Sequence, residues 1–363
     1  MNQHDSVNLR ALARRAMIDA GFEPDFPPDA EREARELEAR ARRQPLSDAS
    51  ARDMRGLLWS SIDNRESRDL DQVEFAEKLP GGDVRLLIGI ADVDAFAPRG
   101  SAIDRRAGRN TTSVYTGVET FPMLPEELST DITSLVEGAD RLAVVIEMVV
   151  GGDGAVKSTD VYRALVHNRA KLAYEPTGAW LESDATESPF VSRVAGLGEQ
   201  LRLQAEVMGW LHALRERNGA LNLQTIEAKP VTEDGKVVDL TVTEHNRARD
   251  VIESFMVAAN TAMAEFLESK KSPAIRRVVR EPERWPRIVE VAESLGDKLP
   301  QEPDSRALSE FLARRRAADP VHFPDLSLTI VKLLGPGEYV VQRPGENGEG
   351  HFGLAVHDYT HST

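Results

Sequence analysis

Three aspartates lie within nine residues of one another in the segment IDNRESRDLDQ, namely Asp63, Asp69 and Asp71. The run before them, GLLWSSI, predicts a strand, so the aspartates would follow in a polar loop at its end. Carboxylate oxygens are the ligands that hard cations such as Mg²⁺ prefer, and like charges this close are costly without a cation. Two cations held in this way can stabilise the attacking water and the leaving oxygen in phosphodiester cleavage. The spacing therefore predicts a metal site, and a solvated acidic loop is the alternative.

The elements that must position these aspartates mix helices with antiparallel hairpins. Two hairpins are predicted, VEFAEKL-PGGD-VRLLIGIADV and RLAVVIEMVV-GGDG-AVKSTDVYRALV, because each joins two apolar runs through a Gly-rich turn. A third is predicted in KPVTEDGKVVDLTVTE. Helical patterns begin at about residue 168 with NRAKLAYEPTGAWLE and recur later in the chain, whereas residues 107–132 predict a loop. Without βαβ alternation, this order favours an α+β fold with a mixed, mostly antiparallel sheet and surrounding helices.

The first 50 residues differ from the rest in composition. NLRALARRAMIDAG and DAEREARELEARARRQ both predict helices, the second with an alternating pattern of charges. We therefore predict a helical extension over residues 1–50, with a helix-turn-helix-like module as one option. Residues 51–363 then form one larger domain.

Composition excludes several classes of protein. The 363-residue chain has no cysteine, which excludes disulfides, thiolate metal sites and cysteine nucleophiles. Its net charge of −15 argues against a general nucleic-acid coat protein, yet it suits carboxylates gathered around a cation. No stretch has the length and apolarity of a membrane helix, and the first residues contain no apolar signal region, so we expect a cytoplasmic protein.

Five motifs in order resemble the catalytic domain of the ribonuclease II family, the RNB domain. They are I-D-x5-D-x-D followed by LLIGIADV; TTSVY with FPMLPEELS; NRAKLAY; NGAL followed by ARDVIESFMVAAN; and HFGLAVHDYTHST. The resemblance runs from about Leu57 to the last residue. It implies an RNB-type fold and a 3′-to-5′ exoribonuclease that hydrolyses single-stranded RNA to nucleoside 5′-monophosphates with Mg²⁺, or with Mn²⁺.

The resemblance also implies the residues of the metal site. Asp63, Asp69 and Asp71 match three of the family's four acidic positions, and Gln72 occupies the fourth, where many members have Asp. The amide oxygen of Gln72 can still ligate a metal, but it brings no charge.

Further matches concern RNA. Tyr115 matches a tyrosine that stacks on the 3′-terminal base, and Tyr174 and Glu253 match residues that contact ribose and favour RNA over DNA. The second stacking aromatic falls near Leu223, which is not aromatic.

The family pattern also continues beyond Thr363. It carries a Ser-Pro-x-Arg segment after the match to HFGLAVHDYTHST, so we expect the domain to be incomplete at its C-terminal end. The arginine of that segment would stabilise charge on the phosphate.

Three functions are compatible with these residues. An exoribonuclease is the first hypothesis, with single-stranded RNA as its partner and no membrane or protein partner evident. The second is an RNA-binding protein of RNB fold with little or no catalysis, which Gln72 and the absent arginine favour. A metal-dependent hydrolase of small molecules is the third. Mg²⁺-dependent release of nucleoside monophosphates would separate the first from the other two.

Overall fold

The computed structural model describes residues 8–43, 48–183, 188–224, 227–233, 236–243, 245–346 and 348–361. Its principal sheet contains β1 (Arg52–Asp53), β2 (Trp59–Asp63), β3 (Gln72–Lys78), β4 (Val84–Ala91), β7 (Asp140–Val150) and β8 (Val156–Ala173). The short paired strands are β5 (Val114–Tyr115) with β6 (Thr120–Phe121), β9 (Glu227–Glu233) with β10 (Lys236–Thr243), and β11 (Ala274–Val278) with β12 (Glu338–Gln342). The longer helices are α1 (Leu9–Asp19), α2 (Pro28–Arg43), α3 (Ala102–Asn110), α4 (Tyr174–Leu181), α6 (Leu197–Arg217), α7 (Arg247–Ser269), α8 (Trp285–Ser294), α9 (Ser305–Ala318) and α10 (Phe323–Leu334).

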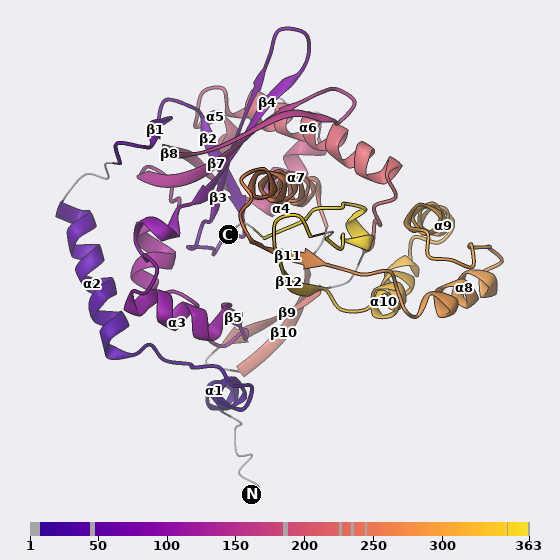
Figure 1. The fold of residues 1–363 in the computed structure, drawn as a ribbon, viewed down its shortest axis with the longest axis horizontal. Helices are drawn as coiled ribbons and strands as arrows, with labels where there is room; N and C mark the ends of the chain where they lie inside the picture. The colour runs from indigo at the N-terminus through magenta and orange to yellow at the C-terminus, as the bar shows by residue number, and fades with distance from the viewer. Residues whose placement is uncertain are drawn as a thin grey trace, which may run out of the picture.

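The principal sheet has the strand order β1-β8-β2-β3-β4-β7, and β7 also pairs with β8. Because β8 pairs with both β2 and β7, the sheet closes on itself. Most neighbours are antiparallel, but β2 runs parallel to β8. The mixed, mostly antiparallel α+β architecture predicted from the sequence is thus confirmed, as are its three hairpins (Figure 1).

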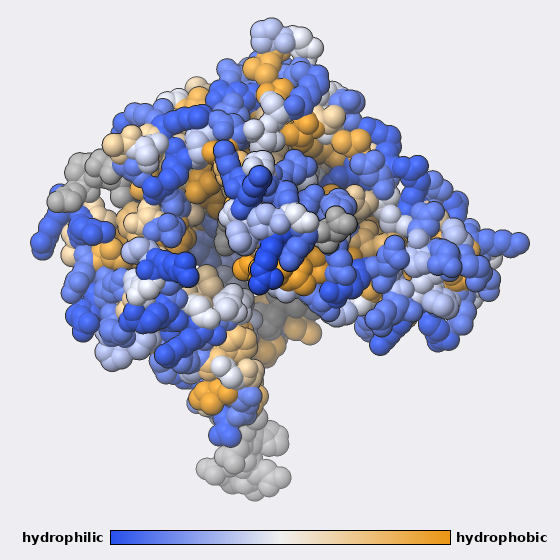
Figure 2. All heavy atoms as spheres, viewed as in Figure 1, coloured by the Kyte–Doolittle hydropathy of each residue, from blue (hydrophilic) through white to orange (hydrophobic). Residues whose placement is uncertain are grey.

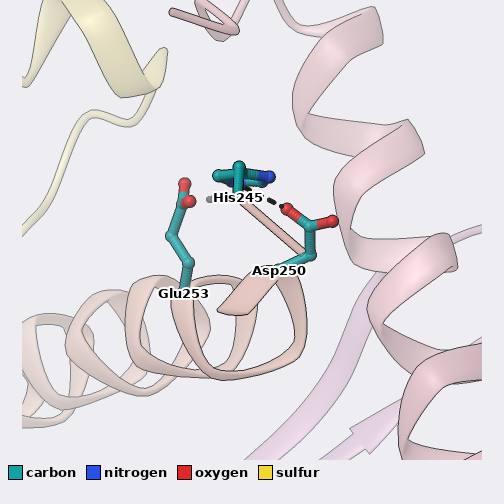
Figure 3. A group of neighbouring side chains, drawn as sticks. All are labelled: His245, Asp250 and Glu253. Atoms are coloured by element: carbon teal, nitrogen blue, oxygen red, sulfur yellow. Dashed lines mark ion pairs between the residues drawn. The ribbon is translucent and has the colours of Figure 1, made fainter. Parts of the chain in front are cut away.

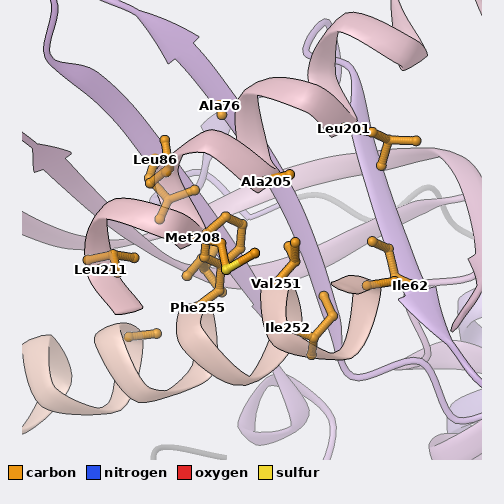
Figure 4. Close-up of a cluster of buried hydrophobic side chains, with 14 of the residues drawn as sticks. Ile62, Ala76, Leu86, Leu201, Ala205, Met208, Leu211, Val251, Ile252 and Phe255 are labelled. Carbon is orange, nitrogen blue, oxygen red and sulfur yellow. The ribbon is translucent and has the colours of Figure 1, made fainter. Parts of the chain in front are cut away.

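Alternation along the strands gives the sheet two apolar faces. One face, with Ile62, Ala76 and Leu86, packs against α6 and α7 (Figure 4). The opposite face carries a second cluster that includes Trp59 and Val73. Successive residues of a strand therefore point into different hydrophobic cores. Moving along a strand by one residue changes whether a side chain faces α6 and α7 or the opposite core.

Two predictions about local structure were wrong. The segment from about residue 168 was expected to be helical, but β8 continues to Ala173 and α4 begins only at Tyr174. Pairing of β8 with β2 outweighs the helix preference of Arg, Ala, Lys and Leu there, since tertiary pairing overrides local propensity. Residues 107–132, expected to be a loop, contain the end of α3, the β5–β6 hairpin and a helical turn at Leu128–Ile132.

Both predicted N-terminal helices are present, separated by residues 20–27. Glu33 on α2 accepts hydrogen bonds from the first backbone N–H groups of α3, at Ala102 (2.7 Å) and Ile103 (3.2 Å). Arg14 on α1 forms an ion pair of 3.2 Å with Glu119, in the turn between β5 and β6. The first 50 residues therefore contact the β5–β6 hairpin directly.

An apolar groove of about 490 Å³ follows α1, and side chains such as Leu12, Val118 and Val237 line it. Orange side chains gather at this helix at the foot of the molecule, whereas most of the visible surface is blue (Figure 2). In the part of the chain that the structure describes, no helix is both long and apolar enough to span a membrane.

Candidate active site

The ends of β2 and β3 bring two of the predicted aspartates together. Ser60 pairs with Glu74 across these antiparallel strands, and continuing this register places Asp63 opposite Asp71. The amide of Gln72 donates a 3.4 Å hydrogen bond to the carbonyl oxygen of Ile62. The Gln72 side chain is buried at this strand junction, where its amide ties the two strands to each other.

The loop between these strands carries Asp69 and is held at two points. Nζ of Lys171 donates hydrogen bonds to the carbonyl oxygens of Arg65 (3.2 Å) and Ser67. Buried Leu70 is fixed through its N–H, which donates to Oγ of Ser134 at 2.9 Å. Asp69 and Asp71 flank Leu70 in the chain, so anchoring this residue sets the course of the backbone that carries both carboxylates.

Electrostatics show that the cluster lacks positive charge. Although the Asp71 side chain is exposed, desolvation by the surrounding protein, then the neighbouring charge of Asp63, raises the pKa of Asp71 to about 6. Burial also raises the pKa of Asp63, with a further increase from Asp69 and a partial offset from Lys171. Raised carboxylate pKa values mean that ionised forms are disfavoured until a cation joins them.

Tyr115 lies beside this cluster. The residue is 66% exposed, and its hydroxyl donates a hydrogen bond of 3.0 Å to Oδ2 of Asp69. Burial of the hydroxyl and the adjacent Asp69 raise the pKa of Tyr115 to about 12. An exposed ring tethered to the carboxylate cluster can offer a stacking surface next to it.

Tyr174 reaches the same edge by way of β8. Ala173, the last residue of β8, is in register with Asp63, so Tyr174 begins α4 directly beside it. The guanidinium of Arg249 lies 4.2 Å from the centre of the Tyr174 ring. Burial, together with the charges of Asp63 and Glu74, raises the pKa of Tyr174, so its hydroxyl stays protonated at neutral pH.

Glu253 occupies a different part of the site. It lies one helical turn after Arg249 on α7, and its carboxylate is 3.8 Å from Arg215. Ligand atoms of Glu253, His245 and Asp250 lie within 4.8 Å of one another, and an ion pair of 3.2 Å joins His245 to Asp250 (Figure 3). These three side chains are exposed or half-buried. Glu253 therefore lies in a second acidic group, carried by the first turns of α7 and the residues before it.

A polar pocket of about 490 Å³ lies next to the loop that follows Asp63. Asn64, Glu175, His245 and Arg249 are among the residues that line it. The pocket therefore extends from the loop after Asp63 to the start of α7.

Leu223 fills an apolar role. It is half-buried and packs against the hydrophobic cluster of α8, α9 and α10. Nothing at this position supplies an aromatic stacking surface.

Two residues important to this site were missed by sequence reasoning. Lys171 holds the aspartate loop, but its strand was predicted to be a helix. Glu74 lies in β3 and is completely buried, and both of its carboxylate oxygens have no hydrogen-bond partner among the described residues. The available signal was an acidic residue between the apolar residues Val73 and Phe75 of the predicted strand.

The types of residue present fit a divalent cation, although among the described residues only His245, Asp250 and Glu253 have ligand atoms all within 4.8 Å of one another. The site offers carboxylate oxygens from Asp63, Asp69 and Asp71, which is the ligand chemistry that Mg²⁺ and Mn²⁺ prefer. The pKa values of Asp63 and Asp71 are raised, and the buried oxygens of Glu74 are unpaired. A bound cation would stabilise the ionised form of such carboxylates.

The chain belongs to the RNB domain family, whose model matches residues 51–363. It is 32% identical over 347 residues to the protein named Ribonuclease R of Thermotoga maritima, covering 93% of this chain and 47% of that relative. The chain thus spans about half the length of this curated relative.

Solved structures share the fold. Mycoplasma genitalium RNase R, solved in complex with ribose methylated single-stranded RNA, has a TM-score of 0.85 at 23% identity, covering 98% of this chain and 54% of that one. Yeast Ssd1, described as a pseudonuclease, has a TM-score of 0.67 at 15% identity, covering 87% of this chain and 39% of that one. The RNB architecture is therefore confirmed, and it occurs in a nuclease and in a pseudonuclease.

Proposed function

We propose that this chain is the catalytic part of a 3′-to-5′ exoribonuclease that hydrolyses single-stranded RNA to nucleoside 5′-monophosphates. The observation that carries the proposal is the convergence of Asp63, Asp69 and Asp71 with two tyrosines at one edge of the sheet. Tyr115 is bonded to Asp69, and Tyr174 lies beside Asp63. A base-stacking surface and a ribose-facing hydroxyl would then flank the carboxylates that act on the terminal phosphodiester bond.

Each side chain has a role in this proposal. Asp63, Asp69 and Asp71 would hold Mg²⁺, or Mn²⁺, and Gln72 would contribute to the same site through its position at the strand junction. When bound, the cation lowers the pKa of the attacking water and offsets charge on the phosphate. Tyr115 would stack on the terminal base and orient Asp69 through its hydroxyl. These roles for the aspartates, Gln72 and Tyr115 rest on their geometry together with the family resemblance.

Recognition of the sugar would fall to Tyr174 and Glu253. The protonated hydroxyl of Tyr174 can donate to a ribose oxygen, and a carboxylate such as Glu253 accepts a hydrogen bond from a 2′-hydroxyl. Because the two lie on different helices, they would contact different nucleotides of one RNA strand.

Paired activity and binding assays test the proposal. The unmodified chain is expected to release nucleoside 5′-monophosphates from a 5′-labelled single-stranded RNA only when Mg²⁺ or Mn²⁺ is present. Asp71→Asn removes one ligand charge, so we expect cleavage to fall by at least about 100-fold while RNA affinity stays within about threefold. Cleavage by the variant at the rate of the unmodified chain would show that Asp71 is not a catalytic residue.

A second candidate is an RNA-binding protein of RNB fold with little or no catalysis. Gln72 favours it, because its amide is engaged with the Ile62 carbonyl and brings no charge to the cation site. RNA binding without release of monophosphates, at any concentration of Mg²⁺ or Mn²⁺, would support this alternative. Hydrolysis of small phosphodiesters with no affinity for RNA would favour a small-molecule hydrolase instead.

We propose further that residues 1–50 form a helical extension in front of the domain at 51–363. The contacts of α1 and α2 with the β5–β6 hairpin and with α3 support a bracing role for Tyr115. A helix-turn-helix-like function of this extension stays a prediction. A cytoplasmic location, where the proposed RNA substrate is available, is part of the same proposal.

A further inference from the structure

Glu74 is an acidic side chain inside the core of the protein. It lies on β3 two residues after Gln72, so both side chains project from the same face of the strand. This face packs against α6 and α7, where Ile62 and Ala76 also point (Figure 4). The exposed fraction of Glu74 is 0%.

Nothing in the described structure compensates the Glu74 carboxyl group. Neither oxygen has a hydrogen-bond partner, and Oγ of Ser60, the residue in register with it on β2, is unpaired as well. Burial of an unpaired carboxyl group is strongly unfavourable, so such groups are normally paired or bound to a metal. By contrast, the buried guanidinium groups of Arg106 and Arg276 each have at least one acidic or carbonyl partner.

The Glu74 carboxyl group also lacks a positively charged partner among the described residues. The guanidinium of Arg249 lies instead over the Tyr174 ring, 3.6 Å from Glu175. Glu74 therefore lies on the same face of β3 as Gln72, and its oxygens have no cationic partner in the described part of the chain.

We propose that Glu74 is a further ligand of the divalent cation held by the three aspartates, and that it supplies the carboxylate charge that Gln72 does not. The proposal rests on the proposed cation site. The site would then contain four carboxylates, and the fourth would come from Glu74, two residues after Gln72 on the same face of β3. The uncharged side chain of Gln72 instead joins β3 to β2 through its hydrogen bond.

The test is direct binding of Mn²⁺ without RNA, measured by calorimetry and by the electron paramagnetic resonance signal of free Mn²⁺. Glu74→Leu is expected to weaken Mn²⁺ binding by about 10-fold or more. It should also raise the melting temperature of the metal-free protein, because an unpaired buried carboxyl group is removed. Glu77→Gln is the matched control, since Glu77 lies on the same strand but is exposed and 3.3 Å from Arg85. Its Mn²⁺ affinity should be unchanged.

A second variant guards against indirect effects. Gln72→Asp, introduced into the Glu74→Leu protein, returns one carboxylate to the same face of β3, and we expect it to recover most of the lost affinity. Unchanged Mn²⁺ affinity in Glu74→Leu would overturn the proposal, as would failure of Gln72→Asp to restore a lost affinity. If the unmodified chain binds Mn²⁺ and Asp71→Asn does not, the cation site itself stands whatever Glu74 does. Absence of binding to the unmodified chain would overturn both.

Discussion

The hydroxyl of Tyr115 donates a hydrogen bond of 3.0 Å to Oδ2 of Asp69. This contact joins the β5–β6 hairpin to the carboxylate cluster, although the two residues are 46 positions apart in the sequence. Under the proposed function, it joins a base-stacking side chain to a metal-binding carboxylate, and the two contributions can be separated by substitution.

Tyr115→Phe keeps the ring and removes the hydrogen bond, whereas Tyr115→Ala removes both. Because stacking on one base contributes about 1–3 kcal/mol, we expect Tyr115→Ala to weaken binding of a short RNA by about 5- to 150-fold. Tyr115→Phe should bind RNA like the unmodified chain and lose only activity. Fluorescence anisotropy with a labelled oligonucleotide measures both affinities, and equal weakening by the two variants would contradict the stacking role.

Sugar selectivity should depend on Tyr174 and Glu253 together. Replacing both with alanine removes the proposed contacts to ribose, so the ratio of DNA to RNA cleavage rates should rise. Single-turnover cleavage of matched DNA and RNA oligonucleotides gives the ratio. Since Tyr174 also lies against Arg249, the single variants should be compared; a ratio unchanged in the double variant would refute the assignment.

Lys171→Met should disorder the aspartate loop. The substitution keeps the length of the side chain and removes the hydrogen bonds to the carbonyls of Arg65 and Ser67. We expect faster amide hydrogen exchange over residues 64–69 and a fall in cleavage of about 10- to 100-fold, because small displacements of catalytic groups are costly. Lys157→Met is the control, since Lys157 is an exposed residue paired with Asp83 at 2.7 Å. Unchanged amide hydrogen exchange in Lys171→Met would show that the order of the loop does not depend on Lys171.

Stabilisation by Mg²⁺ should increase with pH. The pKa of Asp71 is raised to about 6 in the folded protein, whereas an unfolded aspartate has a pKa of about 3.9. Between these values the folded state binds more protons than the unfolded state, so this group lowers the free energy of unfolding as pH rises. A cation binds the ionised form and reverses the loss. The Mg²⁺-induced rise in melting temperature should therefore be larger at pH 7 than at pH 5, and Asp71→Asn should reduce the difference. A shift independent of pH would contradict this account.

Much of the fold and part of the site could be predicted from the sequence. Gly-rich turns between apolar runs indicated the β3–β4 and β7–β8 hairpins, since that signal is local. The end of β8 could not be predicted, because Asn168–Ala173 is held as a strand by β2, a partner distant in sequence. The resemblance identified Asp63, Asp69 and Asp71, whereas the contact between Tyr115 and Asp69 required the structure. Glu74 was missed because alternation predicts a strand without telling which face enters the core.

The parallel pairing of β2 with β8 has a consequence for the order of folding. Asp63 is in register with Ala173, which lies 110 residues further along the chain. The β3–β4 and β7–β8 hairpins are local and can form early, but contacts so distant in sequence form slowly. The edge that gathers the carboxylates can be completed only when β8 closes the sheet. A nascent or partly folded chain would therefore contain most of its strands while still lacking the cluster, so the ability to bind a cation would mark the last stage of folding.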